Sequence, residues 1–109
     1  MYYAQGYHTC YIYIITNKTK TVLYTGVTNN LRQRLQQHKD NIQLGNRTFA
    51  SKYNVQFLLY YEKFTWIHDA IAREKEIKKW RRQKKEELIR TMNPEFEFLN
   101  HFEISPSSK

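Results

Sequence analysis

Cysteine is almost absent from this sequence, which has one, Cys10, among its 109 residues. A single cysteine cannot form an internal disulfide, and Cys10 stands at no metal-ligand spacing. A disulfide-stapled secreted scaffold and a cysteine-based metal module are therefore excluded. A reducing cytoplasm is the expected location.

Long apolar runs are absent as well. A membrane-spanning helix needs about 20 consecutive apolar residues, and no run in the chain approaches that length. The N-terminus also lacks the basic segment followed by an apolar segment that marks a signal peptide. We therefore expect a soluble cytoplasmic protein with no membrane partner.

Positive charge and aromatic side chains are abundant instead. Lys and Arg number 18 against 10 Asp and Glu, which gives a formal net charge of +8. This imbalance favours a polyanionic partner such as nucleic acid, with a merely solvated basic surface as the alternative. Nine Tyr and six Phe predict a packed domain rather than a disordered basic tail.

The length fits one domain. We expect a short lead-in over residues 1–9, a folded domain over 10–100 and a disordered tail over 101–109. Residues 47–54 form an expected polar loop. Apolar periodicity and turn residues predict strands over 11–16, 21–27 and 55–64, and helices from Thr28 or Asn29 to Gly45-Asn46, over 66–80 and over 83–91. The order β-β-α-β-α-α predicts an α/β (α+β) class, with a small antiparallel sheet covered by helices.

Glu74 falls on the expected apolar side of the second predicted helix. A carboxylate there is expensive to bury unless it is paired, hydrogen-bonded or bound to a metal. It could pair with Arg34 or Arg73, lie at a half-exposed edge, or bind a divalent metal. Mg²⁺ often needs only one or two protein carboxylates when phosphate completes its shell. The chain has no second carboxylate cluster, which argues against a two-metal site.

Arg34 and His38 are four residues apart on the first predicted helix and would project side by side. The guanidinium fork matches phosphate oxygens and can stabilise developing charge. The imidazole can move a proton near neutral pH. A histidine on an apolar helix face is also a common structural residue, so both interpretations stay open.

Tyr13 and Tyr24 lie on adjacent predicted strands, and Gly26 follows the second. A phenol can hydrogen-bond a phosphate or a water, and near a cation its pKa can fall enough for general-base chemistry. Core packing is the alternative for any one of nine tyrosines. Gly26 permits a close backbone approach or an unusual backbone angle at the strand end.

The segment 73–90 carries nine Lys or Arg against four Glu. It could be a solvated face laced with ion pairs, but Trp80 adds a stacking surface and favours contact with phosphate. No base-reading motif is visible, and the helix lacks the broad apolar face of a membrane-surface helix. The predicted nucleic-acid contacts are Lys78, Lys79, Arg81, Arg82, Lys84 and Lys85.

These residues resemble the GIY-YIG endonuclease superfamily, and most closely its small stand-alone, excinuclease-C-like members. Tyr11-Ile12-Tyr13 stands in place of the first triplet and Tyr24-Thr25-Gly26 in place of the second. Tyr11 replaces the leading glycine, and Thr25 replaces the middle residue. Arg34 and His38 follow at the spacing that the family uses on its first helix.

Later residues extend the resemblance, which covers roughly residues 11–99. Glu74 matches the helix glutamate that holds the family's metal, and Asn93 matches a late asparagine that supports the site. The resemblance implies the GIY-YIG fold, a three-stranded antiparallel sheet flanked by helices, with one Mg²⁺ or Mn²⁺ ion at Glu74.

The implied activity is hydrolysis of phosphodiester bonds in duplex or branched DNA, in DNA repair or recombination. In the mechanism that the resemblance implies, Tyr13 acts as the general base or supports it, and His38 is the competing candidate. Arg34 and Tyr24 would orient the phosphate. The predicted catalytic residues are Tyr13, Tyr24, Arg34, His38, Glu74 and Asn93. A non-catalytic nucleic-acid-binding module that keeps the fold is the alternative function.

Overall fold

The structure is a computed structural model that describes residues 9–45 and 47–100. The expected tail and nearly all of the expected lead-in lie outside the described residues, as does Asn46. The elements in chain order are β1 (Cys10–Thr16), β2 (Leu23–Thr28), α1 (Leu31–Leu44), α2 (Phe49–Tyr53), β3 (Phe57–Phe64), α3 (Ile67–Lys78) and α4 (Arg82–Met92). The predicted fold class is confirmed. The loop expected over 47–54 is wrong in part, because it contains α2.

The three strands form one antiparallel sheet in the order β2-β1-β3. Every residue of the central strand β1 is buried, which explains why its sequence is a continuous apolar run. Tyr13 stands opposite Gly26 on β2 and Tyr61 on β3. In β3, Tyr60 pairs with Ile14 and Leu58 pairs with Ile15, so Leu59 between them has no partner on β1. This bulge bends the strand.

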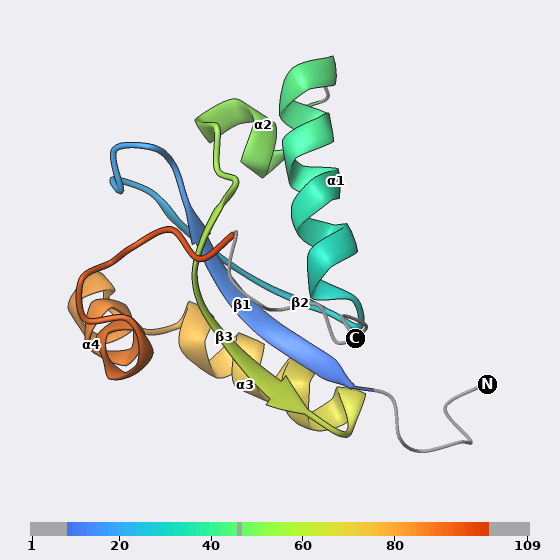
Figure 1. The fold of residues 1–109 in the computed structure, drawn as a ribbon. Helices are drawn as coiled ribbons and strands as arrows, with labels where there is room; N and C mark the ends of the chain where they lie inside the picture. The colour runs from blue at the N-terminus through green and yellow to red at the C-terminus, as the bar shows by residue number, and fades with distance from the viewer. Residues whose placement is uncertain (1–8, 46, 101–109) are drawn as a thin grey trace.

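Two layers of helices cover the sheet (Figure 1). On one side lies α1, with α2 packed beside it, and on the other lie α3 and α4. Alternate residues of β1 point to opposite faces: Tyr11, Tyr13 and Ile15 join the core with α1, whereas Ile12 and Ile14 join the core with α3 and α4. The site residues on β1 therefore face α1.

Asn30 is the N-cap of α1, one residue after Asn29 and two after Thr28, the two expected starts of this helix. The Asn30 side chain accepts a hydrogen bond from the Gln33 backbone N–H at 3.0 Å, which satisfies one free donor of the first turn. Thr28 orders the preceding turn by accepting from the Asn30 backbone at 3.1 Å. Gly45 ends the helix as predicted, in a left-handed conformation at φ 74°.

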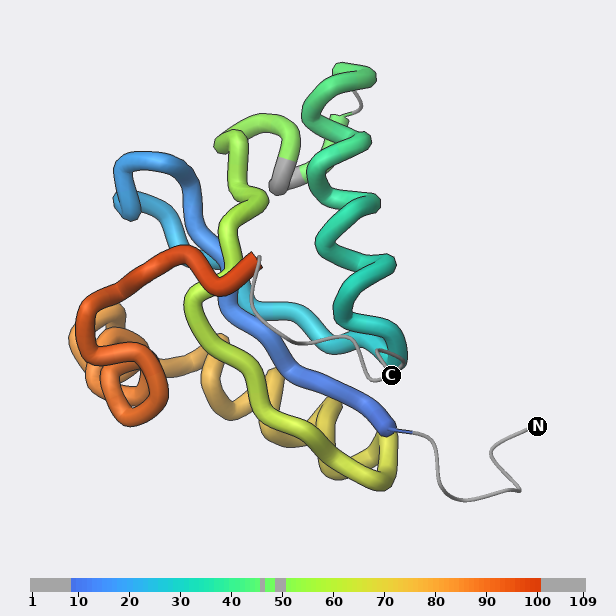
Figure 2. The backbone as a smooth tube through the Cα atoms, viewed as in Figure 1, coloured from blue at the N-terminus to red at the C-terminus, as the bar shows by residue number. Residues whose placement is uncertain are grey.

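The segment after α4 returns alongside β3 (Figure 2). The Leu99 backbone N–H donates to the Leu58 carbonyl at 2.8 Å, and the Asn100 side chain accepts from the Leu58 N–H at 2.6 Å. These bonds satisfy backbone groups that an edge strand would otherwise leave open. Among residues 9–45 and 47–100, no helix is long and apolar enough to cross a membrane.

Candidate active site

Tyr13 and His38 form the buried centre of the site. The Tyr13 hydroxyl lies 2.9 Å from Nε2 of His38, and the two side chains are 1% and 3% exposed. Arg34 Nε donates to the same hydroxyl at 3.3 Å. One phenol oxygen thus joins β1 to two residues of α1, as the spacing of Arg34 and His38 on one helix face allows.

Burial shifts both partners toward their uncharged forms. Burial raises the pKa of Tyr13 to about 12, although the neighbouring Arg34 guanidinium lowers it. Burial, followed by the Arg34 charge, lowers the pKa of His38 to about 4. At neutral pH the pair is therefore a protonated phenol beside a neutral imidazole.

His38 also carries an unsatisfied atom. Within the described part of the chain, its Nδ1 is a buried polar atom without a hydrogen-bond partner. Such atoms are rare in folded proteins, because burial without a partner is unfavourable. Nδ1 therefore has no protein partner among these residues, whereas Nε2 faces the Tyr13 hydroxyl.

Tyr24 completes the aromatic part of the site. Its ring centroid lies 5.6 Å from that of His38 and 6.4 Å from that of Tyr13. Burial alone would lower the pKa of Arg34, but its hydrogen bond with Tyr13 and, to a smaller extent, Tyr24 raise that pKa. Unlike Tyr13, Tyr24 is only half-buried, as is Arg34. These two side chains therefore form the part of the site nearest to solvent.

Arg34 has a further partner that the sequence interpretation did not include. Its Nη1 donates to Oε1 of Gln37 at 2.9 Å. The spacing of three residues on one helix was the available signal. Gln37 restrains the guanidinium without neutralising it, so Arg34 keeps its full charge for an anionic ligand.

Glu74 lies on α3, which covers the face of the sheet away from α1. This helix also packs against the edge strand β2. The Glu74 carboxylate is close enough to raise the pKa of Tyr13. The Glu74 side chain is 16% exposed. It forms an ion pair with Lys78, whose Nζ lies 2.9 Å from Oε2 of Glu74. The ion pair considered with Arg34 or Arg73 is wrong, because Lys78 is the partner.

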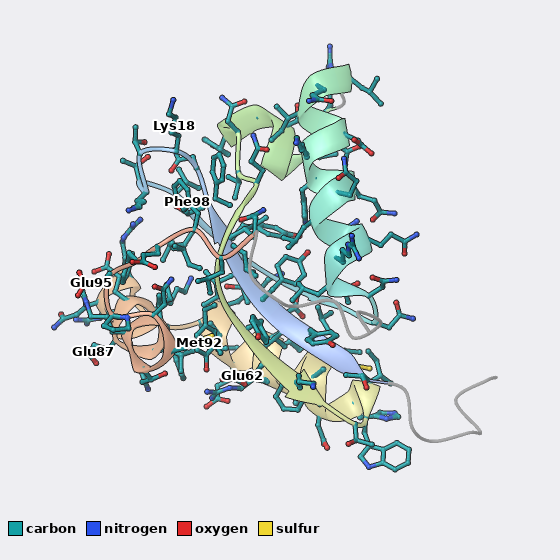
Figure 3. The ribbon with its side chains drawn as sticks, viewed as in Figure 1. Lys18, Glu62, Glu87, Met92, Glu95 and Phe98 are labelled. Atoms are coloured by element: carbon teal, nitrogen blue, oxygen red, sulfur yellow. The ribbon has the colours of Figure 1, made fainter. Side chains whose placement is uncertain are left out.

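Arg73 instead fixes α3 to β3. Its guanidinium donates to both carboxylate oxygens of Glu62, with Nη2 2.9 Å from Oε2 and Nε 3.0 Å from Oε1. Tyr60 donates its hydroxyl proton to the same carboxylate. Glu62 lies on the face of the sheet that α3 and α4 cover (Figure 3). This fork–fork contact sets the orientation of α3, and with it the position of Glu74.

Glu74 is the carboxylate that this site offers to a metal ion. The described residues contain no group of three or more His, Cys, Asp or Glu side chains that could hold an ion. A zinc-type site is therefore a poor fit for this part of the chain. A hard cation such as Mg²⁺ or Mn²⁺ fits Glu74 better, because it keeps several waters and can take further oxygens from a phosphate.

Asn93 lies elsewhere in the fold. Its side-chain N–H groups donate to the carbonyls of Leu59 at 3.0 Å and Glu97 at 2.8 Å, and its oxygen accepts from the Glu97 N–H at 2.9 Å. These bonds hold the β3 bulge against the segment after α4. Any support that Asn93 gives to the site is therefore indirect.

The predicted nucleic-acid contacts fall into different environments. Lys78 is at the site, paired with Glu74. Arg82 is held by the β1–β2 turn, where it donates to the Thr21 and Lys20 carbonyls at 2.7 and 2.8 Å. Lys84 lies 4.3 Å from the Trp80 ring centroid. The others are exposed or half-exposed: Lys79, Arg81 and Lys85.

Comparison with known proteins identifies the family. The model of the GIY-YIG catalytic domain matches residues 9–87. This span is well over half of the chain, so the protein belongs to the GIY-YIG family, a family of nuclease domains. The matched residues contain all of the predicted catalytic positions except Asn93.

The relatives are small proteins of similar length. The chain is 38% identical over 85 residues to a UPF0213 protein of Syntrophus aciditrophicus, covering 78% of this chain and 93% of that protein. It is 40% identical over 75 residues to the UPF0213 protein in the ldhD 5′ region of Pediococcus acidilactici, covering 69% and 74%.

A solved structure supports the same fold. The solution NMR structure of the UPF0213 protein BH0048 from Bacillus halodurans is 26% identical in sequence and superposes with a TM-score of 0.51. The comparison covers 89% of this chain and 97% of that chain. The comparisons identify the GIY-YIG family, and the predicted resemblance to its excinuclease-C-like members stays a prediction.

Proposed function

We propose that this protein is a divalent-metal-dependent endonuclease that hydrolyses phosphodiester bonds in DNA. The observation that carries the proposal is the buried pair of Tyr13 and His38, joined at 2.9 Å, with Arg34 on the same hydroxyl. The Glu74 carboxylate is linked to the site through Lys78, whose ammonium lies 2.9 Å from Glu74 and 5.8 Å from the Tyr24 ring centroid. Phosphodiester hydrolysis needs a proton acceptor, positive charge at the phosphate and a ligand for a hard cation.

In this proposal the phenol of Tyr13 donates its hydrogen bond to Nε2 of His38. The imidazole is neutral at physiological pH because its pKa is about 4, so Nε2 has a lone pair available. As a water attacks the phosphorus, the Tyr13 oxygen takes the proton of that water and passes its own proton to His38. Tyr13 and His38 thus act together as the base, with the phenol nearest the water.

Arg34 has two roles in this scheme. Its Nε–H donation to the Tyr13 hydroxyl stabilises negative charge on the phenol oxygen during proton transfer. Its half-buried guanidinium also presents donors to a phosphate oxygen beside Tyr24. A cation held by Glu74 would supply Lewis-acid stabilisation of the charge that develops on the phosphate.

Nicking of supercoiled plasmid with Mg²⁺ or Mn²⁺ tests the proposal. Tyr13→Phe and Glu74→Gln should each lower the nicking rate by about 10²-fold or more, since each removes a group acting in the transition state. Glu87→Gln is the matched control, because it removes an exposed carboxylate from α4. Circular dichroism checks that Glu74→Gln is folded. If folded Glu74→Gln nicks the plasmid as fast as wild type, the assignment of a metal-dependent endonuclease is rejected.

A non-catalytic nucleic-acid-binding module is the second candidate. It is favoured by the pairing of Glu74 with Lys78, which leaves the only predicted metal ligand already neutralised. This candidate predicts no metal-stimulated nicking and DNA binding that falls steeply with salt. It also predicts that Glu74→Gln leaves DNA binding intact or strengthens it, because one negative charge is lost.

A further inference from the structure

Lys78 occupies the place at Glu74 that a divalent cation would need. Its ammonium lies 2.9 Å from Oε2 of Glu74 and 5.8 Å from the ring centroid of Tyr24. Two cations cannot share one carboxylate oxygen without strong repulsion at this distance. A metal ion and the Lys78 ammonium therefore compete for the same atom.

The two partners differ in their freedom to move. The Glu74 side chain is 16% exposed, whereas that of Lys78 is 48% exposed. Lys78 is also the last residue of α3, where the free carbonyls of the helix end favour a cation in any case. The lysine can therefore leave toward solvent while the carboxylate keeps its position.

We propose that the Lys78 ammonium is a resident counter-ion of Glu74, which a divalent cation must displace in order to bind. This inference rests on the proposed function, because it takes Glu74 as the metal ligand. The ammonium balances a largely buried carboxylate in the metal-free protein. It also weakens metal binding in the absence of DNA, and its release would leave a free positive charge beside Tyr24.

Binding of Mn²⁺ to the full chain without DNA tests the inference directly. Electron paramagnetic resonance of the free Mn²⁺ signal gives the dissociation constant for each variant. Lys78→Met should bind Mn²⁺ about tenfold more tightly than wild type, because a single charge this close to a doubly charged ion acts with roughly that strength at a partly exposed site. Lys78→Arg keeps the competing charge and should bind no more tightly than wild type.

Lys75→Met is the matched control. Lys75 is exposed on the same helix and next to Glu74 in sequence, so this variant removes the same net charge without freeing the carboxylate. Its affinity for Mn²⁺ should stay within about twofold of wild type, since exposed charges are screened. An equal gain in Lys75→Met and Lys78→Met would overturn the counter-ion role and indicate a general charge effect.

Glu74→Gln separates the two hypotheses. If Glu74→Gln loses Mn²⁺ binding and Lys78→Met fails to gain it, the counter-ion role is rejected while the metal site stands. If Glu74→Gln binds Mn²⁺ as wild type does, Glu74 is no metal ligand, and both the inference and the metal-binding part of the proposed function are rejected. Loss in Glu74→Gln together with a gain in Lys78→Met supports both.

Discussion

The ring of Tyr13 lies against the backbone of Gly26, its antiparallel partner on β2. A Cβ atom added at Gly26 would lie 2.5 Å from Cζ and 3.0 Å from Cε2 of Tyr13. The phenol can therefore cross the edge strand only because this position has no side chain. This crossing brings the hydroxyl to His38, so the glycine of the second triplet shapes the site without reacting.

Gly26→Ala should damage both the fold and the site. The methyl group must push the Tyr13 ring away, which separates its hydroxyl from His38 and overpacks a buried strand pair. We expect unfolding free energy to fall by about 1–3 kcal/mol. Nicking per folded molecule should fall by at least about tenfold, because misplaced catalytic groups lose rate steeply. Urea denaturation and plasmid nicking measure the two effects.

Gly45→Ala is the control for this prediction. A Cβ at Gly45 meets nothing within 4 Å, but its φ of +74° is unfavourable for alanine. This variant should lose about 1 kcal/mol of stability from backbone strain alone and keep its nicking rate per folded molecule. Full activity in Gly26→Ala would show that the contact between Tyr13 and Gly26 does not position the phenol.

His38 should make the folded state sensitive to acid. Its pKa is about 4 in the folded protein against an ordinary value of 6.5, because burial and then Arg34 disfavour the charged imidazole. Between these two values the unfolded chain binds a proton that the folded chain does not. The stability contribution is therefore fully present above about pH 6.5 and is lost as the pH falls toward 4, by about 2–3 kcal/mol.

Chemical denaturation of wild type and His38→Phe at several pH values measures this contribution. The difference between their unfolding free energies should stay constant above about pH 6.5 and shift in favour of the variant as the pH falls. His68→Gln serves as the control, because His68 is exposed and meets water in both states. Parallel curves for wild type and His38→Phe down to pH 4.5 would contradict the assignment of a buried neutral imidazole.

The fold could be predicted from sequence because local patterns and tertiary packing agree in the strands. The apolar run of β1 matches a strand that is buried on both faces. Three features escaped prediction because packing decides them. The short helix α2 packs against α1, Asn30 rather than Thr28 or Asn29 caps α1, and the segment after α4 pairs with β3 through Leu99 and Asn100.

The site could be predicted only in part. The spacing of Arg34 and His38 placed both on one face of α1, and the structure joins both to Tyr13. The partner of Glu74 was missed, although Lys78 stands four residues later, a spacing that indicates an ion pair on a helix. Arg34, Arg73 and Lys78 were all possible partners by sequence, and only the folded side chains show that the one on the same helix pairs with Glu74.

Arg82 should act in stability more than in DNA binding, contrary to its predicted contact with nucleic acid. Its guanidinium donates to the Lys20 and Thr21 carbonyls and to Glu86, and so ties the start of α4 to the β1–β2 turn. Arg82→Ala should lower the unfolding free energy by about 1–2 kcal/mol. Arg82→Lys should lose nearly as much, because an ammonium cannot reproduce the fork.

The salt dependence of DNA binding separates this role from phosphate contact. Lys79 is exposed on the same basic segment, and Lys79→Ala should reduce the slope of log affinity against log salt by about 0.9 without changing stability, if its ammonium neutralises one phosphate. Arg82→Ala and Arg82→Lys should leave that slope near the wild-type value while both unfold more easily. A reduced slope in Arg82→Ala, restored in Arg82→Lys with no loss of stability in either, would instead make Arg82 a phosphate ligand.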